Sequence, residues 1–344
     1  MKTTITKIML GMALMAACSS PQTSVEVGFL VDDYDTERWK KDEALFVEKI
    51  KELDAKVTVK NAGGRSDLQF TQAKELIEKG VDILVVVPSD ANDAARIVDY
   101  AHEHKVKVIA YDRLIKNVDL DYYISFDNVK VGELQAEYLT RRRPEGRYAI
   151  LSGPSTDNNS FLFKLGQLAV LQPLIEKGDI QIVYETFLHD WDEKEAFHIM
   201  DQLLGKHQLE VDAILAGNDE IAQGAIKALK KHKMHGKVLV SGQDASIAAC
   251  KAIIRNEQTM TVYKPLAAIA NAAALTAVKL AKNEPLDYVN QSVNNGKIMV
   301  PAILLSSMTA VHRQNMTLTI VADNFHNETA IYGNYDKRLL ADSQ

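Results

Sequence analysis

The sequence predicts an α/β protein with two similar lobes, each built from a parallel sheet with helices on both faces. Two observations support this fold class. Short β-branched runs alternate with longer amphipathic stretches, which is the pattern of a parallel sheet covered by helices. The alternation starts at Val25 and starts again near Arg147, so the 344-residue chain contains the same kind of unit twice.

The first unit contains a regular series of strands and helices. We expect strands at 25–31, 56–61, 82–88, 106–111 and 122–126. The intervening helices are expected at 37–53, 68–79 and 91–104, with another beginning near Lys130. The helix at 68–79 is followed by Gly80, a residue type that commonly ends helices.

The second unit has strands at 147–153, 180–186, 212–216 and 237–242, with helices between them. The segments 260–265 and 266–282 follow after that sheet is complete, so we expect the chain to cross back to the first lobe there, and residues 297–305 to cross again. The predicted first lobe is therefore 25–131 with 264–294, and the second is 132–263 with 295–325. A polar tail, 326–344, would follow. Three crossing segments would make a hinge, with the ligand at the strand ends that face the cleft.

The N-terminus is typical of an exported bacterial protein. Lys2 and Lys7 precede an apolar run, 8–17, that is too short to span a bilayer. Two alanines then precede Cys18, as a lipoprotein signal peptidase requires. We expect residues 1–17 to be a signal peptide, Cys18 to be lipidated and 18–24 to be a tether, which places the protein in the periplasm on a bacterial membrane. The alternative is an ordinary secretory signal with a cysteine there by chance.

The composition is that of a soluble globular protein, with 47% hydrophobic and 25% charged residues. Loss of Lys2 and Lys7 with the signal peptide would change the formal net charge from -6 to -8. An acidic protein of this kind is a poor candidate for nucleic-acid binding. Lipidation of Cys18 would leave Cys250 without a partner for an intramolecular disulfide. We expect a monomer.

The sequence contains few signs of catalysis or cofactor binding. It has neither common type of Gly-rich phosphate loop and no nucleophile elbow. Its nine histidines are scattered without other metal-ligand residues near them. We therefore expect no cofactor, no metal site and no enzymatic activity.

Polar side chains and both tryptophans follow successive predicted strands, where the cleft between the lobes would lie. These candidate ligand-binding residues are Arg38, Trp39, Asp112, Arg113, Asp157, Asn159, Trp191, Asn218, Asp244 and Lys264. Three of them are cationic and three anionic, which suits a neutral ligand better than a phosphate, an amino acid or a carboxylate. A pyranose has polar hydroxyls at its rim and C–H groups on its faces, so two flat indoles and a ring of donors and acceptors would suit it.

Taken singly, each residue has an ordinary structural alternative. Arg38 could lie on the surface, Asp112 could end a strand, and Asp219 is better explained as a helix cap than as a contact.

Several longer stretches carry a more specific resemblance. They are ERWKKD at 37–42, AYDRLI at 110–115, YISFDNVKVGELQAE at 123–137, DNN at 157–159, SGQDA at 241–245 and QTMTVYKP at 258–265. Over nearly all of 25–326 the chain resembles the D-xylose-binding proteins of bacterial ABC import systems. That resemblance implies the type I fold of periplasmic binding proteins. It also implies pentose contacts from the eight polar candidates, stacking by Trp39 and Trp191, and an ABC permease as partner. The chain departs from the family pattern at 88–92, at 141–143 and in the tail at 336–344.

Three other functions share parts of this pattern. The effector domain of a repressor has the same fold but would need a DNA-binding motif where this chain has its apolar leader. A pentose-converting enzyme, such as an isomerase, would need an acid and base pair or metal ligands beside the sugar. A xylose sensor that presents sugar to a membrane histidine kinase would use the same two lobes, so the sequence leaves transport and sensing open.

Overall fold

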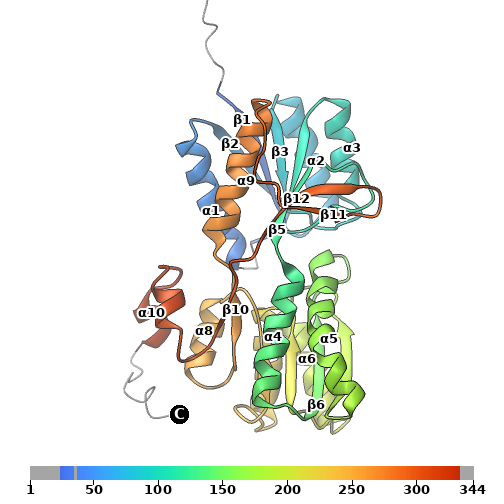
Figure 1. Ribbon diagram of the computed structural model, residues 1–344, viewed down its shortest axis with the longest axis vertical. Helices are drawn as coiled ribbons and strands as arrows, with labels where there is room; N and C mark the ends of the chain where they lie inside the picture. The colour runs from blue at the N-terminus through green and yellow to red at the C-terminus, as the bar shows by residue number, and fades with distance from the viewer. Residues whose placement is uncertain (1–23, 35–36, 334–344) are drawn as a thin grey trace, which may run out of the picture.

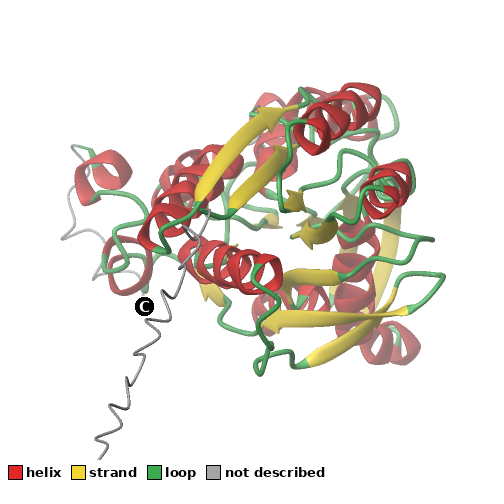
Figure 2. Ribbon diagram, turned by 90° about the horizontal axis from the view of Figure 1, so that it is seen from above, coloured by secondary structure: helices red, strands yellow, loops and turns green. Residues whose placement is uncertain are grey.

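The computed structural model describes residues 24–34 and 37–333, and these form the two predicted α/β lobes, one above the other in Figure 1. The predicted signal peptide, Cys18 and most of the tether lie outside the described residues, as does the tail from 334 onward. Helices lie on both sides of the sheets when the molecule is seen from above (Figure 2), as the sequence predicts.

The first lobe is built around a seven-stranded sheet in the order β11-β12-β5-β4-β3-β1-β2. Its strands are β1 (Glu26–Val31), β2 (Lys56–Asn61), β3 (Ile83–Val86), β4 (Lys107–Tyr111), β5 (Tyr122–Phe126), β11 (Gln291–Asn294) and β12 (Met299–Leu305). Its helices are α1 (Glu37–Glu52), α2 (Ser66–Glu78), α3 (Ala95–Glu103) and α9 (Leu266–Ala281). All pairings are parallel except that of β11 with β12.

Side chains of β1 alternate between the two faces of this sheet, as the period of a strand requires. Phe29 packs with Phe46 of α1 and Ala273 of α9 on one face. Leu30 packs with Leu76 of α2 and Ile97 of α3 on the other. Both faces are therefore buried, which is why the strands of this lobe have continuous apolar runs.

The second lobe has a four-stranded parallel sheet in the order β7-β6-β8-β9. Its strands are β6 (Gly146–Ser152), β7 (Ile180–Phe187), β8 (Ala213–Ala216) and β9 (Leu239–Ser241). Its helices are α4 (Asn128–Arg142), α5 (Asn158–Lys177), α6 (Glu193–Gly205), α7 (Asp219–Lys231) and α8 (Ile247–Ile254). A two-stranded antiparallel pair, β10 (Thr261–Tyr263) with β13 (Thr309–Val311), lies beside it.

The chain crosses between the lobes three times, but two of these crossings lie away from the predicted boundaries. Strand β12 pairs in parallel with β5 of the first sheet, so residues 299–305 belong to the first lobe rather than the second, and the third crossing lies between β12 and β13. The apolar strand completes the sheet by pairing with β5, a contact that sequence periodicity does not specify. Helix α4 begins at Asn128 and packs along α5, so the first crossing also precedes the predicted boundary at 131.

The predicted polar tail is wrong for residues 326–333. Helix α10 (Glu328–Tyr332) packs against α8, and its Ile331 and Tyr332 are buried with Ile253 and Met316. Burial of these two apolar side chains stabilises the contact of the segment with the second lobe, although the surrounding sequence is polar.

Candidate functional site between the lobes

The ten candidate residues come together around a single cavity between the lobes. Together with Phe163 and Gln243 they line a narrow cavity with a free volume of about 20 Å³. Side chains of the two lobes therefore nearly fill the space between them. Strand ends that are far apart in the chain thus meet at one place.

The site aspartate Asp112 directly follows β4, and Asp244 lies in the turn after β9, which ends at Ser241. Both adopt a left-handed backbone, with φ of 62° and 90°. Such conformations are unfavourable for residues other than glycine and persist only where neighbours hold them. The carbonyl of Asp112 accepts hydrogen bonds from the hydroxyls of Tyr123 and Ser125, at 3.0 and 2.7 Å. The backbone is therefore held in the turn that directs this carboxylate into the cleft.

Arg38 is the cation that joins carboxylates of the two lobes. It is only 5% exposed, and its guanidinium lies 3.0 Å from Asp112 and 3.4 Å from Asp244. A third ion pair, at 3.1 Å, links it to Asp42 one turn along α1. Burial alone would lower the pKa of Arg38, but the three carboxylates raise it well above its usual value. Arg38 thus stays charged within the protein.

The carboxylates around Arg38 respond differently. Burial would raise the pKa of Asp112, but the charges of Arg38, Lys264 and Arg113 together hold it below its usual value. Burial raises the pKa of Asp42 in spite of Arg38. The two carboxylates therefore differ in the balance of burial and neighbouring cations, which favours the ionised form more strongly at Asp112 than at Asp42.

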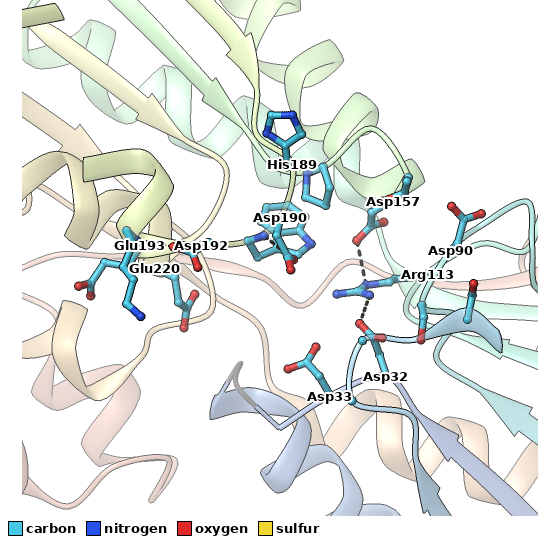
Figure 3. A pocket seen from close by; sticks show the side chains of 18 residues that line it. Asp32, Asp33, Asp90, Arg113, Asp157, His189, Asp190, Asp192, Glu193 and Glu220 are labelled. Atoms are coloured by element: carbon cyan, nitrogen blue, oxygen red, sulfur yellow. Dashed lines mark hydrogen bonds and ion pairs between the residues drawn. The ribbon is translucent and has the colours of Figure 1, made fainter. Parts of the chain in front are cut away.

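Arg113 bridges the lobes in a second place. Its guanidinium lies 2.6 Å from Asp32 and 2.8 Å from Asp157, and Figure 3 shows it between these two carboxylates. Burial raises the pKa of Asp157 by more than Arg113 lowers it. Sequence reasoning missed Asp32, although it directly follows β1 and so carries the same strand-end signal as the candidates.

Lys264 and Asn159 complete the polar lining. Lys264 lies at the crossing from β10 to α9, is 1% exposed, and places Nζ 2.9 Å from the Asp244 carboxylate. Asn159 donates to the carboxylate of Asp112 at 3.2 Å and accepts from Asn128 at 2.8 Å. The amide therefore connects the first helix turn of the second lobe to the strand end of the first.

Asn218 has a structural role as well as a place in the lining. Its side-chain oxygen caps α7 by accepting from the Ile221 backbone at 2.9 Å. The cap that the sequence suggested for Asp219 therefore belongs to the preceding residue. Asp219 is instead fully buried behind the site, where it accepts hydrogen bonds from Thr261 and Gln258 at 3.0 and 2.9 Å.

The two tryptophans come from opposite lobes. Trp39 lies in the first turn of α1, is 2% exposed, and has the Arg113 guanidinium 5.2 Å from its ring centroid. Its Nε1 has no hydrogen-bond partner among the described residues. Trp191 lies in the loop between β7 and α6 and packs so closely on Gly153 that a Cβ there would come within 2.2 Å of the ring. Glycine is required at that position by the close approach of the indole.

Two lining residues were not predicted and have no comparable sequence signal. Phe163 lies inside α5 and packs edge-on to Trp191, with ring centroids 6.3 Å apart. An apolar residue within a helix looks like core in sequence. Gln243 lies one residue before Asp244, and only the turn that follows β9 brings it to the cavity.

A larger cavity of about 670 Å³ adjoins the first, and the two share Arg113, Asp157 and Trp191. Carboxylates from both lobes gather around it in Figure 3, namely Asp32, Asp33, Asp90, Asp157, Asp190, Asp192, Glu193 and Glu220. Their negative field would disfavour anionic ligands. In residues 24–34 and 37–333, no group of three histidine, cysteine or acidic side chains is arranged to hold a metal ion.

Comparison with known proteins agrees with this architecture. Residues 27–285 match a protein family described as periplasmic binding protein domain. The chain belongs to the periplasmic binding protein family. Its predicted type I fold, with two lobes and mainly parallel sheets, is thereby confirmed.

Two relatives of this periplasmic binding protein are called D-xylose-binding periplasmic proteins, which confirms the resemblance found in the sequence. The protein from Haemophilus influenzae is 42% identical over 94% of this chain and 97% of its own length. The protein from Escherichia coli is 40% identical over 92% of this chain and 96% of its own length. Both relatives are named as binding proteins rather than as enzymes.

Among solved structures, a carbohydrate transporter solute binding protein from Chloroflexus aurantiacus in complex with D-glucose resembles this periplasmic binding protein. The two superpose with a TM-score of 0.83 at 29% identity, over 89% of this chain and 98% of the other.

Proposed function

We propose that this periplasmic binding protein holds D-xylose between its lobes and delivers it to an ABC importer. The observation that carries the proposal is the single cavity lined by all ten candidate residues, with an indole from each lobe and a balanced set of charges. The names of the relatives that are 40 to 42% identical support xylose as the ligand.

The chemistry of the cavity suits a neutral sugar. Hydroxyls can donate to the carboxylates of Asp112, Asp157 and Asp244 and accept from Arg38 and Lys264, all of which line it. Hydrogen bonds to charged groups contribute roughly 1.5 to 3 kcal/mol each. Micromolar affinity corresponds to about 8 kcal/mol, so a handful of such bonds is enough.

Selection for a pentose would come from the lack of room for a hydroxymethyl group at C5. Overpacking a closed interior costs roughly 1 to 3 kcal/mol, which corresponds to about five- to 140-fold in affinity. Calorimetric titration with D-xylose, D-ribose, L-arabinose and D-glucose tests this. We expect xylose to bind most tightly. Comparable affinity for glucose would contradict pentose selection, and failure to bind any of the four would overturn the proposed function.

We propose that the protein binds sugar without converting it. The supporting observation is that each site carboxylate already faces a cation of the protein, as in the Asp157–Arg113 and Asp244–Lys264 pairs. Incubation of purified protein with ¹³C-labelled xylose, followed by NMR, should show only xylose. The appearance of a second sugar would contradict this.

We further propose that residues 1–17 are removed, that Cys18 is lipidated, and that residues 18–24 tether a monomeric protein to a bacterial membrane in the periplasm. Within residues 24–34 and 37–333, no helix has the length and apolar character to cross a bilayer. Cys18→Ser is the decisive variant. We expect the wild-type protein in the membrane fraction with the mass of a lipidated chain, and the variant in the soluble fraction. Equal partition would argue against the anchor.

The membrane partner decides between transport and sensing, because an ABC permease and a sensor kinase would each recognise the same closed arrangement of the lobes. Deleting the gene and measuring uptake of radiolabelled xylose tests delivery to a permease. Loss of uptake supports the proposal. Normal uptake with loss of xylose-dependent transcription would instead favour a membrane histidine kinase as partner.

A further inference from the structure

The segment that follows the third crossing is an integral part of the second lobe. Met316, Ile320, Ile331 and Tyr332 are buried in one cluster with Cys250 of α8. Phe325 packs on Tyr263 of β10, with ring centroids 5.0 Å apart. The segment is therefore held on the second lobe by its own apolar contacts.

One point of this segment contacts the opposite lobe. Lys41 lies on α1, which packs against α9 in the first lobe. Its Nζ is 4.0 Å from the ring centroid of Phe325, 3.4 Å from the Phe325 carbonyl and 3.3 Å from Nδ1 of His326. A cation over an aromatic face is attracted to it, more strongly where water is partly excluded.

The same segment is connected to the ligand loop. The Nε2 atom of His326, which is 8% exposed, lies 2.8 Å from the carbonyl oxygen of Ala245. Ala245 follows Asp244, and both have a left-handed backbone. On the other lobe, Lys41 is three residues from Arg38, the residue that pairs with Asp244. Residues three apart share a face of a helix, so Lys41 extends the same side of α1 beyond the ligand cavity.

We propose that Lys41, together with Phe325 and His326, forms a latch that favours the closed arrangement of the lobes and thereby sets the affinity for the ligand. None of the three is among the residues that line the cavity of the ten candidates. A contact that exists only when the lobes meet raises the population of the closed form. Apparent affinity rises with the fraction of molecules in that form.

The latch rests on the proposed sugar-binding function, and Lys41→Met tests it. The variant keeps the length and apolar stem of the side chain but removes the cation. Calorimetry and stopped-flow release of xylose should show affinity weakened by at least about fivefold, mainly through faster dissociation. The unfolding temperature measured without sugar should stay near that of the wild type.

Three further variants separate a latch from a general effect of altering α1. Lys40→Met changes the neighbouring exposed lysine and should leave xylose affinity unchanged. Lys41→Arg restores a cation over the Phe325 ring and should recover most of the affinity. Phe325→Leu keeps an apolar side chain against Tyr263 while removing the ring, and should reproduce the effect of Lys41→Met.

The outcomes are distinct. If Lys41→Met and Lys40→Met bind xylose equally well, with equal dissociation rates, the latch is wrong while sugar binding stands. If the wild-type protein binds no sugar, the proposed function itself fails. A fall in the sugar-free unfolding temperature of Lys41→Met, without rescue by arginine, would show that Lys41 only supports the fold and would overturn the latch.

Discussion

At the scale of single residues, the site is a set of charges that neutralise one another across the cleft. Arg38 joins Asp112 of the first lobe to Asp244 of the second, and Arg113 joins Asp32 to Asp157 in the same way. Removing one member would leave a buried charge without its partner, which is strongly destabilising. Asp244→Ala would therefore leave Lys264 unpaired at 1% exposure, and a loss of ligand in that variant would be confounded by a loss of stability.

Trp191 is the better residue for testing the position of the ligand, because it carries no charge and lies partly exposed in a loop. We expect Trp191→Ala to weaken xylose binding by about 2 kcal/mol, or roughly thirtyfold, by removing one of the two stacking faces. Titration calorimetry measures the affinity, and circular dichroism during heating provides the control for folding. Unchanged affinity in a folded variant would mean that the ligand lies elsewhere.

The lowered pKa of Asp112 predicts a pH dependence of stability. Its pKa is lower in the folded chain than the unfolded value of about 3.9, so ionised Asp112 contributes stability that is fully present above that value. The contribution is lost as the pH falls through the folded pKa. The unfolding temperature of the wild type minus that of Asp112→Asn should therefore be constant from about pH 7 to pH 5 and shrink below about pH 4. Scanning calorimetry of both proteins provides the values, and a difference independent of pH would contradict the assignment.

At the scale of elements, the carboxyl ends of the strands and the first turns of the helices that follow provide most of the site. Asp157 and Asn218 both cap helices and both line the cavity, so the local rule that selects a cap also places a polar side chain at the cleft. The position of the C-terminal segment has a different cause. It depends on a few apolar side chains that are buried against α8.

That placement predicts a stability effect in a region that looks polar in sequence. Ile331→Ala removes a side chain that is 3% exposed and should destabilise the protein by about 2 to 4 kcal/mol. Leu318→Ala is the matched control, because that leucine is in the same segment but 79% exposed, and it should change stability little. Urea unfolding monitored by fluorescence measures both. Equal stability of the two variants would show that α10 contributes nothing to the second lobe.

At the scale of the whole molecule, the chain crosses three times between the lobes, and contacts across the cleft hold them together. Besides the ion pairs, the backbone of Ala91 in the first lobe donates to the carbonyl of Thr156 in the second at 3.1 Å. Ligand that binds only when both lobes contact it shifts the population toward the closed form.

Small-angle scattering can follow this shift in solution. We expect the radius of gyration to fall when xylose is added, because both lobes line the proposed sugar site. Trp191→Ala should need more xylose to reach the same compact state, in proportion to its weaker binding. A radius that is the same with and without saturating xylose would argue against closure as the response to ligand.

The sequence by itself was sufficient to predict the α/β class and the two lobes, and its family resemblance singled out the ten residues that line the cavity. The class and the lobes depend on local rules, since strand and helix periods, caps and strand ends are all visible within a few residues. Buried Phe163 inside α5 and the carboxylate of Asp42 on α1 could not be identified in this way, because nothing nearby in the chain distinguishes them from core or surface residues.

Only the tertiary structure decided which lobe receives β12, where the segment after β13 lies, and which charges meet. Strand β12 could join either sheet as far as its own composition is concerned, and its pairing with β5 settles the matter. Lys41, Phe325 and His326 have no distinctive sequence signal, and their contact joins segments of the two lobes that are far apart in the chain. The physical reason is the same in both cases: local periodicity determines which elements form, whereas the free energy of burying surfaces distant in the chain determines how they are placed.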